Sequence, residues 1–195
     1  MFELKVYRDR WRSADGSQLG LRAITPNDVE MLNQFFAKLS PLSRYQRFHC
    51  DRRILTDAQA RYLSRVDAER HIAFMVCTLQ AGQEHMVAEV RCVALGAQSW
   101  QAEYAIVVDD AWQRQGIGRR CMAHLMDAAH AYGFSELVGE VLASNMAMRQ
   151  FLKAIAIDCA PSSGSASHSR LHLARLRGSR MDSVPGHPSN FTHPF

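Results

Sequence analysis

The stretch from Val107 to Arg120 reads VVDDAWQRQGIGRR, and it decides the fold that we expect for the rest of the chain. It leaves an apolar strand that ends at Val108, passes through a short polar turn and enters a helix. Gly116 and Gly118 stand where that helix must begin, and glycine lets a backbone turn closely or approach a ligand without a side-chain clash. The first amides of a helix have no partner inside it and lie at the positive end of its dipole. The stretch therefore predicts a phosphate or pyrophosphate site. An ordinary strand-to-helix turn is the alternative.

Length and composition limit the classes of protein to which the chain can belong. The 195 residues are expected to form one compact domain, and the net charge of +4 suits an anionic ligand but is too small and scattered to indicate nucleic-acid binding. The five cysteines are odd in number and form no CxxC pair, so we expect neither a disulfide framework nor a metal site. No apolar run approaches the roughly 20 residues that span a bilayer. These features predict a cytoplasmic protein without membrane partners.

The apolar pattern outlines the elements in order. A hairpin over residues 4–23 precedes helices over 25–39, 42–48 and 56–65. Strands over 72–79, 85–93 and 101–108 are joined by short loops, which favours an antiparallel meander. The helix that follows the glycines ends at Gly133. The next strand, 137–142, follows a helical crossover and should run parallel to 101–108. A last helix over 145–154 and two short paired strands, 155–159 and 170–176, complete a domain of residues 1–176. Residues 177–195, rich in Pro, Gly, Ser and His, are expected to be a disordered tail.

The motif Gln113-x-x-Gly116-x-Gly118, after a strand beginning Ala102-Glu103, resembles the acyl-CoA signature of the GNAT N-acetyltransferase superfamily. The segment VLASNMAMRQFL, residues 141–152, is similar to the strand and helix that follow the signature in that superfamily. The resemblance spans about residues 18–176. It implies an α+β fold in which a mixed, mostly antiparallel sheet carries helices on both faces. Two parallel strands in this sheet would splay apart to hold the CoA arm.

Two upstream segments resemble a narrower group. LSPLSRYQRF, residues 39–48, and VDAER, residues 66–70, are similar to segments of bacterial protein-lysine acetyltransferase modules. The resemblance implies transfer of an acetyl group from acetyl-CoA to a primary amine, either a protein lysine or a small molecule. Because no cysteine or serine has the setting of a nucleophile, the amine would attack directly in a ternary complex. A homodimer is left open.

The resemblance also assigns residues to the donor site. The turn would give backbone N–H groups to the CoA pyrophosphate, the strand end would bond the pantetheine arm, and Asn145 would contact the same arm. The cofactor-binding residues expected on this basis are Val107, Val108, Gln113, Arg114, Gln115, Gly116, Ile117, Gly118, Arg119 and Asn145. For the arginines, a solvated place at the helix start is the alternative. For Asn145 the alternative is a simple helix cap.

Glu103 is the expected general base. It is the lone carboxylate of an apolar strand, on the same face as Ala105 and Val107. Burial would raise its pKa toward the range in which a base works near neutrality, and its position matches the strand glutamate that serves as base in many protein acetyltransferases of the superfamily. A strand-end glutamate that faces water is the alternative.

The general acid is missing from its usual place. Many superfamily members carry a tyrosine seven residues after the asparagine, where this chain has Leu152. A leucine cannot donate a proton, although a thiolate is a tolerable leaving group without one. The departure motivates a second hypothesis, a GNAT-like module that binds acyl-CoA without efficient transfer. A P-loop or Rossmann protein is disfavoured, since no Gly-Lys-Ser/Thr and no third glycine are present.

Overall fold

The computed structural model describes residues 6–49, 54–80, 82–97, 99–155, 157–161 and 166–172. These residues form one eight-stranded sheet in the order β1-β2-β3-β4-β5-β6-β8-β7. Of the strand pairs that they form, only β5–β6 is parallel. The strands are β1 (Asp9–Arg12), β2 (Gln18–Ala23), β3 (His71–Gln80), β4 (Gln83–Ala94), β5 (Gln101–Val108), β6 (Glu136–Leu142), β7 (Asp158–Pro161) and β8 (Ala166–His172).

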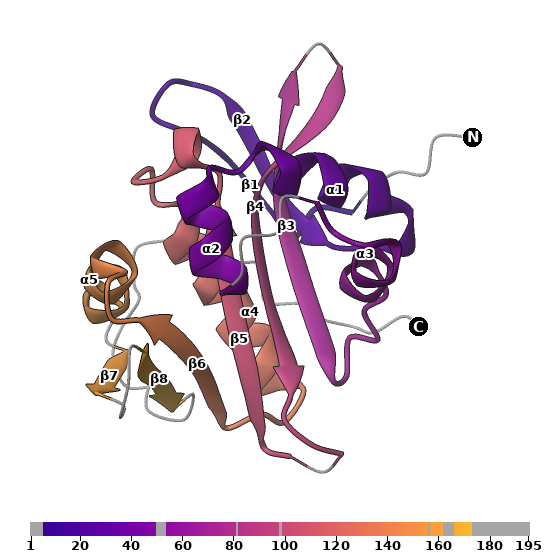
Figure 1. Cartoon of the computed structure of the whole chain (residues 1–195). Coiled ribbons are helices and arrows are strands. Elements are labelled where there is room, and N and C mark those ends of the chain that lie inside the picture. Colours follow the sequence, from indigo (N-terminus) through magenta and orange to yellow (C-terminus); the bar gives the residue numbers. More distant parts are fainter. Residues whose placement is uncertain are drawn as a thin grey trace.

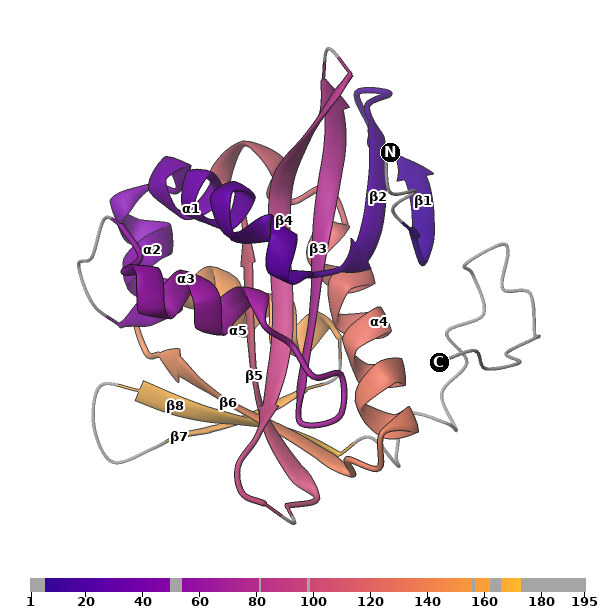
Figure 2. The same cartoon turned by 90° about the vertical axis from the view of Figure 1, so that its right-hand side faces the viewer.

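Helices cover both faces of the sheet, as Figures 1 and 2 show. The helices are α1 (Val29–Lys38), α2 (Pro41–Phe48), α3 (Asp57–Ser64), α4 (Ile117–Ala131) and α5 (Met146–Ala154). In Figure 2 the first three lie on one side of β3 and β4, while α4 lies on the other. The expected α+β fold and its antiparallel meander are therefore confirmed.

Alternation along β5 divides its side chains between two cores. Tyr104 is buried with Cys92 on the α4 side, where the larger apolar cluster lies. Val107 points the other way and packs in the cluster beneath α1 and α3. Glu103 and Ala105 share this second face, because side chains two apart in a strand point the same way.

Short-range bonds fix α2 directly after α1. Ser40 is the N-cap, its hydroxyl accepts from the Ser43 amide at 3.1 Å, and Pro41 takes the first helical position. Arg44 is buried and donates to the Leu39 carbonyl at the end of α1. The orphan carbonyls at the end of one helix are thus satisfied by the next helix.

The parallel strands β5 and β6 are joined only at one end. Among the described residues their ladder has three pairs, Gln101–Glu136, Ala102–Leu137 and Glu103–Val138. Beyond Glu103 the strands separate, and β6 turns to pair with β8 over its whole length (Figure 1). The splayed parallel pair expected from the resemblance is present.

Several predicted boundaries differ from the structure. Within the described part of the first predicted strand, the ladder to β2 spans Asp9–Arg12. The strand β8 begins at Ala166, four residues before the prediction, because its whole length pairs with β6. Tyr132, which has the spacing of the apolar side chains on α4, is instead exposed where that helix ends. Residues 173–176 of the predicted last strand and the predicted tail, 177–195, lie outside the described residues.

Candidate functional site

The turn between β5 and α4 has the backbone of an anion site. After a 3-10 turn over Asp110–Trp112, Arg114 adopts φ +60° and Gly116 adopts φ +80°. A left-handed arginine is strained, and such strain collects at ligand sites. Alternating left- and right-handed residues also turn successive amides toward one concave side. The helix α4 then begins at Ile117, so its first amides point into the same region.

Both glycines leave room for a ligand to approach this backbone. A Cβ added at Gly116 would meet no atom within 4 Å. A Cβ at Gly118 would touch the ring of Phe151 at 3.5 Å, so this glycine also sets how closely α5 approaches α4. These observations fit a diphosphate held by main-chain amides.

The long side chains in and after the turn mostly form hydrogen bonds to main-chain carbonyls. The Nε2 of Gln113 donates to the Val108 carbonyl at 3.1 Å, and the Nε2 of Gln115 donates to the Ala111 carbonyl at 3.2 Å. Arg119 donates to the Ala154 carbonyl at 3.1 Å. Each of these groups therefore has an intramolecular partner.

Two further arginines differ in how they are held. Arg120 pairs with Asp9 at 2.8 Å and lies over the Trp11 ring, which commits it to the β1 side. Arg114 is exposed. It is the cation of the turn best placed to meet a phosphate.

Asn145 caps α5. Its side-chain oxygen accepts from the Met148 amide at 3.0 Å, and the residue is buried at the end of β6. The plain alternative from the sequence is therefore correct. A contact with the CoA arm remains a proposal, since the amide nitrogen of the side chain is not used by this cap.

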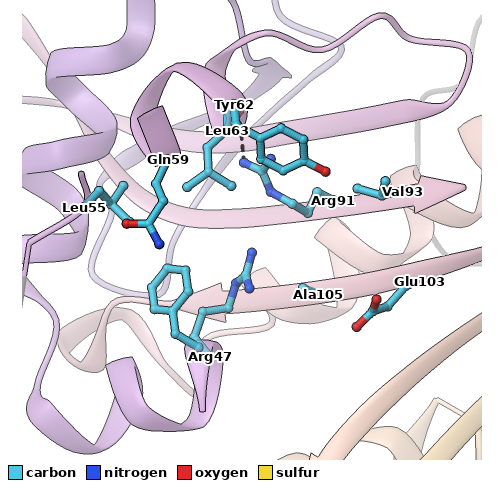
Figure 3. Close-up of a pocket in the computed structure, with 10 residues that line it drawn as sticks. Arg47, Leu55, Gln59, Tyr62, Leu63, Arg91, Val93, Glu103 and Ala105 are labelled. Carbon is cyan, nitrogen blue, oxygen red and sulfur yellow. Dashed lines mark hydrogen bonds between the residues drawn. The ribbon is translucent and has the colours of Figure 1, made fainter. Parts of the chain in front are cut away.

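A pocket of about 320 Å³ opens between α2, α3 and strands β4 and β5 (Figure 3). Its wall is half apolar and half polar. The lining residues are Arg47, Phe48, Leu55, Gln59, Tyr62, Leu63, Arg91, Val93, Glu103 and Ala105. Two segments that are well separated in the chain, residues 47–63 and 91–105, thus enclose it from both sides.

Glu103 lines this pocket, but its expected burial is wrong. The side chain is exposed, and Figure 3 shows it at one end of the pocket beyond Ala105. The reason is its place near the start of β5, opposite Val93 near the end of β4, where α2 and α3 leave the pocket open. A role for Glu103 as the general base therefore depends on its position in the pocket and not on burial.

Two residues that line the pocket, Arg47 and Arg91, belong to a buried charge cluster that the sequence analysis did not identify. Glu89 is completely buried and pairs with Arg91, and also with Arg47 at 3.5 Å. Arg91 further donates to His71 Nε2 at 2.7 Å and to the Leu63 carbonyl at 3.1 Å. These bonds join α2, α3, β3 and β4 at one point.

The cluster shifts the pKa values of its members. Burial alone would raise the pKa of Glu89, but Arg91 and Arg47 lower it and keep the carboxylate charged. Burial, followed by the charge of Arg91, lowers the pKa of His71 to about 4. At neutral pH His71 is therefore an uncharged acceptor for Arg91. The signal available in the sequence was Glu89-x-Arg91, two charges on one face of an otherwise apolar strand.

The side chain at the usual position of the general acid is buried away from the pocket. Leu152 is completely buried in the core on the α4 side, so this side chain does not reach the pocket. The hydroxyl of Tyr45 on α2 does not replace the usual acid, since this residue is 46% exposed and does not line the pocket.

Metal ligands do not gather in the part of the chain that the structure describes. Within it, no group of three His, Cys, Asp or Glu side chains could hold a metal ion. Among the same residues, each helix is too short or too polar to cross a membrane.

Comparisons with known proteins connect this geometry to a family. The family model described as an acetyltransferase (GNAT) domain matches residues 18–156. An acetyltransferase of Pseudomonas aeruginosa is 29% identical over 152 residues, which cover 77% of this chain and 81% of that protein. Acetyltransferase Pat of Mycolicibacterium smegmatis is 32% identical over 137 residues, or 70% of this chain but 40% of Pat. The chain therefore matches less than half the length of Pat.

Solved structures share the fold. The GNAT domain of S. lividans PAT aligns with a TM-score of 0.77 and 23% identity, covering 84% of this chain and 96% of that domain. A cAMP-binding acyltransferase from Mycobacterium smegmatis aligns with a TM-score of 0.60 and 26% identity, covering 92% of this chain and 50% of that protein.

Proposed function

Because the chain belongs to the GNAT acetyltransferase family, and is thus an acetyl-CoA-dependent N-acyltransferase, we propose that it acetylates the side-chain amine of protein lysines. The observation that carries this proposal is the position of Glu103 at one end of a half-apolar pocket on β5, the strand that leads into the glycine turn. Residues 1–176 would act as one catalytic domain.

The donor would bind along β5 and the turn. The pyrophosphate would meet the amides of residues 114–118 at the positive end of α4, with Arg114 adding charge. The pantetheine arm would lie where β5 and β6 separate, because their parallel ladder ends at the Glu103–Val138 pair. Val107, Val108 and Asn145 border this opening from its two sides.

The acceptor would enter the pocket from the side of α2 and α3. An aliphatic stem would lie against Phe48 and Leu55, and its amine would reach the carboxylate of Glu103. A primary ammonium must lose a proton before it can attack. Since Glu103 is exposed, a water molecule would relay this proton to the carboxylate.

The reaction would be a direct transfer. The amine nitrogen forms a bond to the thioester carbonyl carbon, the carbon–sulfur bond breaks and the sulfur leaves with its electron pair. The proton lost by the nitrogen passes through water to Glu103. The CoA thiolate takes its proton from solvent, because Leu152 is a buried hydrocarbon and a thiolate tolerates leaving unprotonated.

A protein lysine is favoured over a small amine by residues 39–48 and 66–70, which resemble segments of bacterial protein-lysine acetyltransferase modules. An open rim supports the same choice, since Tyr62 beside the pocket is 56% exposed and can meet residues that flank a lysine. A fully enclosed pocket would suit a small molecule better.

The test measures CoA release and acetylation together. The full chain is incubated with acetyl-CoA and either a cell lysate treated to remove free amines or a panel of small amines. Thiol release and mass spectrometry of lysines are the two readouts. Enzyme-dependent acetyl-lysine with matching CoA release is expected. Release with the small amines alone would exclude a protein substrate.

The second candidate, an acyl-CoA-binding module, is favoured by one observation, the complete burial of Leu152 where the family acid usually stands. Calorimetry with acetyl-CoA separates the two. Binding without thiol release on any amine or protein would support the module.

A further inference from the structure

The start of α2 is bonded to the segment that leads into the glycine turn. Asp110, the first residue of the 3-10 turn after β5, accepts from the Ser40 amide at 3.0 Å and from the Ser40 hydroxyl at 2.8 Å. It also accepts from the Ser43 hydroxyl at 2.8 Å. A carboxylate 70 residues from Ser40 in the chain thus caps the positive end of α2.

These hydrogen bonds stabilise the ionised form of Asp110. Its partial burial would raise the pKa, but the Ser40 amide and the hydroxyls of Ser43 and Ser40 lower it. Asp110 therefore stays ionised well below neutral pH. Charge-assisted hydrogen bonds of this kind are stronger than neutral ones.

The other end of the same helix forms the acceptor pocket. Arg47 and Phe48, in the last turn of α2, line it, and Arg47 pairs with the buried Glu89 of β4. The helix has eight residues, so about 12 Å separate its two ends. A helix this short moves as one rigid piece, and its start cannot shift without moving Arg47.

Asp110 itself lies a few residues before the glycine turn. Trp112, buried between them, and the bond from the Asp109 amide to the Val87 carbonyl at 2.9 Å fix this segment to the sheet. Any change in the turn that shifts Asp110 acts on Ser40 and Ser43 directly (Figure 1 shows the α2 start beside this segment).

We propose that Asp110 is a positioning residue that couples the donor turn to the acceptor pocket, so that acetyl-CoA on the turn fixes α2 and thereby the pocket wall. This inference rests on the proposed donor site. By linkage the coupling is reciprocal, and a bound acceptor strengthens donor binding by the same factor. The partner pair Asp110–Ser43 carries the coupling, while Lys38, which pairs with Asp109 at 3.0 Å and is largely exposed, does not.

The first experiment follows hydrogen exchange of the α2 amides with and without saturating acetyl-CoA, and it needs no acceptor. In the wild-type chain acetyl-CoA should slow exchange over residues 42–48 about fivefold or more, the lower end of the usual range of coupling energies. In Asp110→Ala the donor should still bind but the protection of α2 should disappear. Equal protection in wild type and Asp110→Ala, or none in the wild type once binding is shown by calorimetry, would overturn the coupling.

Ser43→Ala is the second variant, since it removes one bond from the helix side and leaves the loop intact. It should lose part of the protection, and the double variant should lose no more than Asp110→Ala alone, because both act on one contact. Lys38→Ala is the control and should behave as wild type. Additive losses would show that the two residues act separately and would contradict the proposal.

Kinetics provide the functional readout. At saturating acetyl-CoA, Asp110→Ala should raise the acceptor KM about fivefold or more with kcat within about twofold, the lower end of usual coupling. If the wild-type chain binds acetyl-CoA but releases no CoA with any amine, the proposed function fails, while the exchange experiment still decides the coupling.

Discussion

The two halves of the candidate site are built from different parts of the chain. The proposed donor turn is contiguous, residues 113–118, and offers main-chain amides, two glycines and a left-handed arginine. The proposed acceptor pocket is assembled from α2, α3, β4 and β5, and two of its lining residues, Arg47 and Arg91, pair with the buried Glu89. Recognition of a ligand by main-chain groups needs only local backbone geometry. Recognition by side chains from distant segments needs those segments to be brought together by the whole fold.

The contrast predicts how each half fails. Damage to the donor turn should weaken ligand binding at a smaller loss of stability. Damage to the buried charge cluster beside the pocket should cost more stability as well as activity, because the same charges join four elements. The following variants test this contrast.

Removing the charge of Glu89 should have the largest effect. In Glu89→Gln two arginines lose their buried counter-ion, which costs on the order of 3–5 kcal/mol. Urea denaturation measures the free energy of unfolding, and the exposed strand glutamate Glu140 gives a matched control, Glu140→Gln. A loss of less than about 1 kcal/mol in Glu89→Gln, far below the usual cost of breaking a buried pair, would show that the cluster is not what joins the elements.

Glu103→Gln should lower kcat by about 100-fold or more, since general bases contribute in that range. The affinity for acetyl-CoA measured by calorimetry and the melting temperature should stay near wild type, because Glu103 is exposed and lies on the acceptor side. Unchanged turnover would remove Glu103 from the mechanism, and parallel loss of donor affinity would erase the distinction between the halves.

His71 makes the acceptor half sensitive to acid. Its folded pKa of about 4 lies below the ordinary value of 6.5, so the unfolded chain binds more protons between these values. The stabilisation is complete above about pH 6.5 and is lost as the pH falls toward 4. For a shift of this size, the loss is on the order of 2–3 kcal/mol.

His71→Gln keeps an acceptor for Arg91 but cannot titrate. Its free energy of unfolding, measured by urea denaturation at a series of pH values from neutral down to about 4.5, should fall less steeply with acid than that of the wild-type chain. Parallel curves for the two proteins would mean that His71 is not held neutral by burial and Arg91.

Gly116→Ala should have the smallest effect and a different character. Gly116 and Gly82 both adopt φ +80°, and a Cβ added at either would meet no atom within 4 Å, so alanine strains both backbones by about 1–2 kcal/mol. Only Gly116→Ala should raise the Kd for acetyl-CoA, by about tenfold, because only this glycine lies in the turn that would hold the diphosphate. Equal Kd values for Gly116→Ala and the control Gly82→Ala would show that the turn does not contribute to donor binding.

The backbone of the proposed donor turn could be predicted from the sequence because it depends on neighbours in the chain, whereas its binding of acetyl-CoA stays a prediction. A glycine in the sequence directly indicates a position with a free backbone, as at Gly116 and Gly118. A strand before these glycines and a helix after them can also be recognised from neighbouring residues. The splay of β5 and β6 came from the resemblance, and the three-pair ladder agrees with it.

The acceptor half could be predicted only in outline. The pairing of Arg47 with Glu89 joins residues 42 positions apart, and no spacing rule indicates which arginine meets which carboxylate. The burial expected for Glu103 was wrong for a related reason. Alternation gives the face of a strand, but the extent of the helices above it decides whether a residue on that face is covered.

The three-pair ladder between β5 and β6 also divides the sheet into unequal cooperative units. The strands β2–β5 share long antiparallel ladders, whereas β6, β8 and β7 join them through three residue pairs and the packing of α4 and α5. Hydrogen exchange in native conditions should show β6 and β8 opening at lower free energy than β3 and β4. A ligand that lies across this seam would hold both units together, so its binding should slow exchange well beyond the atoms it touches.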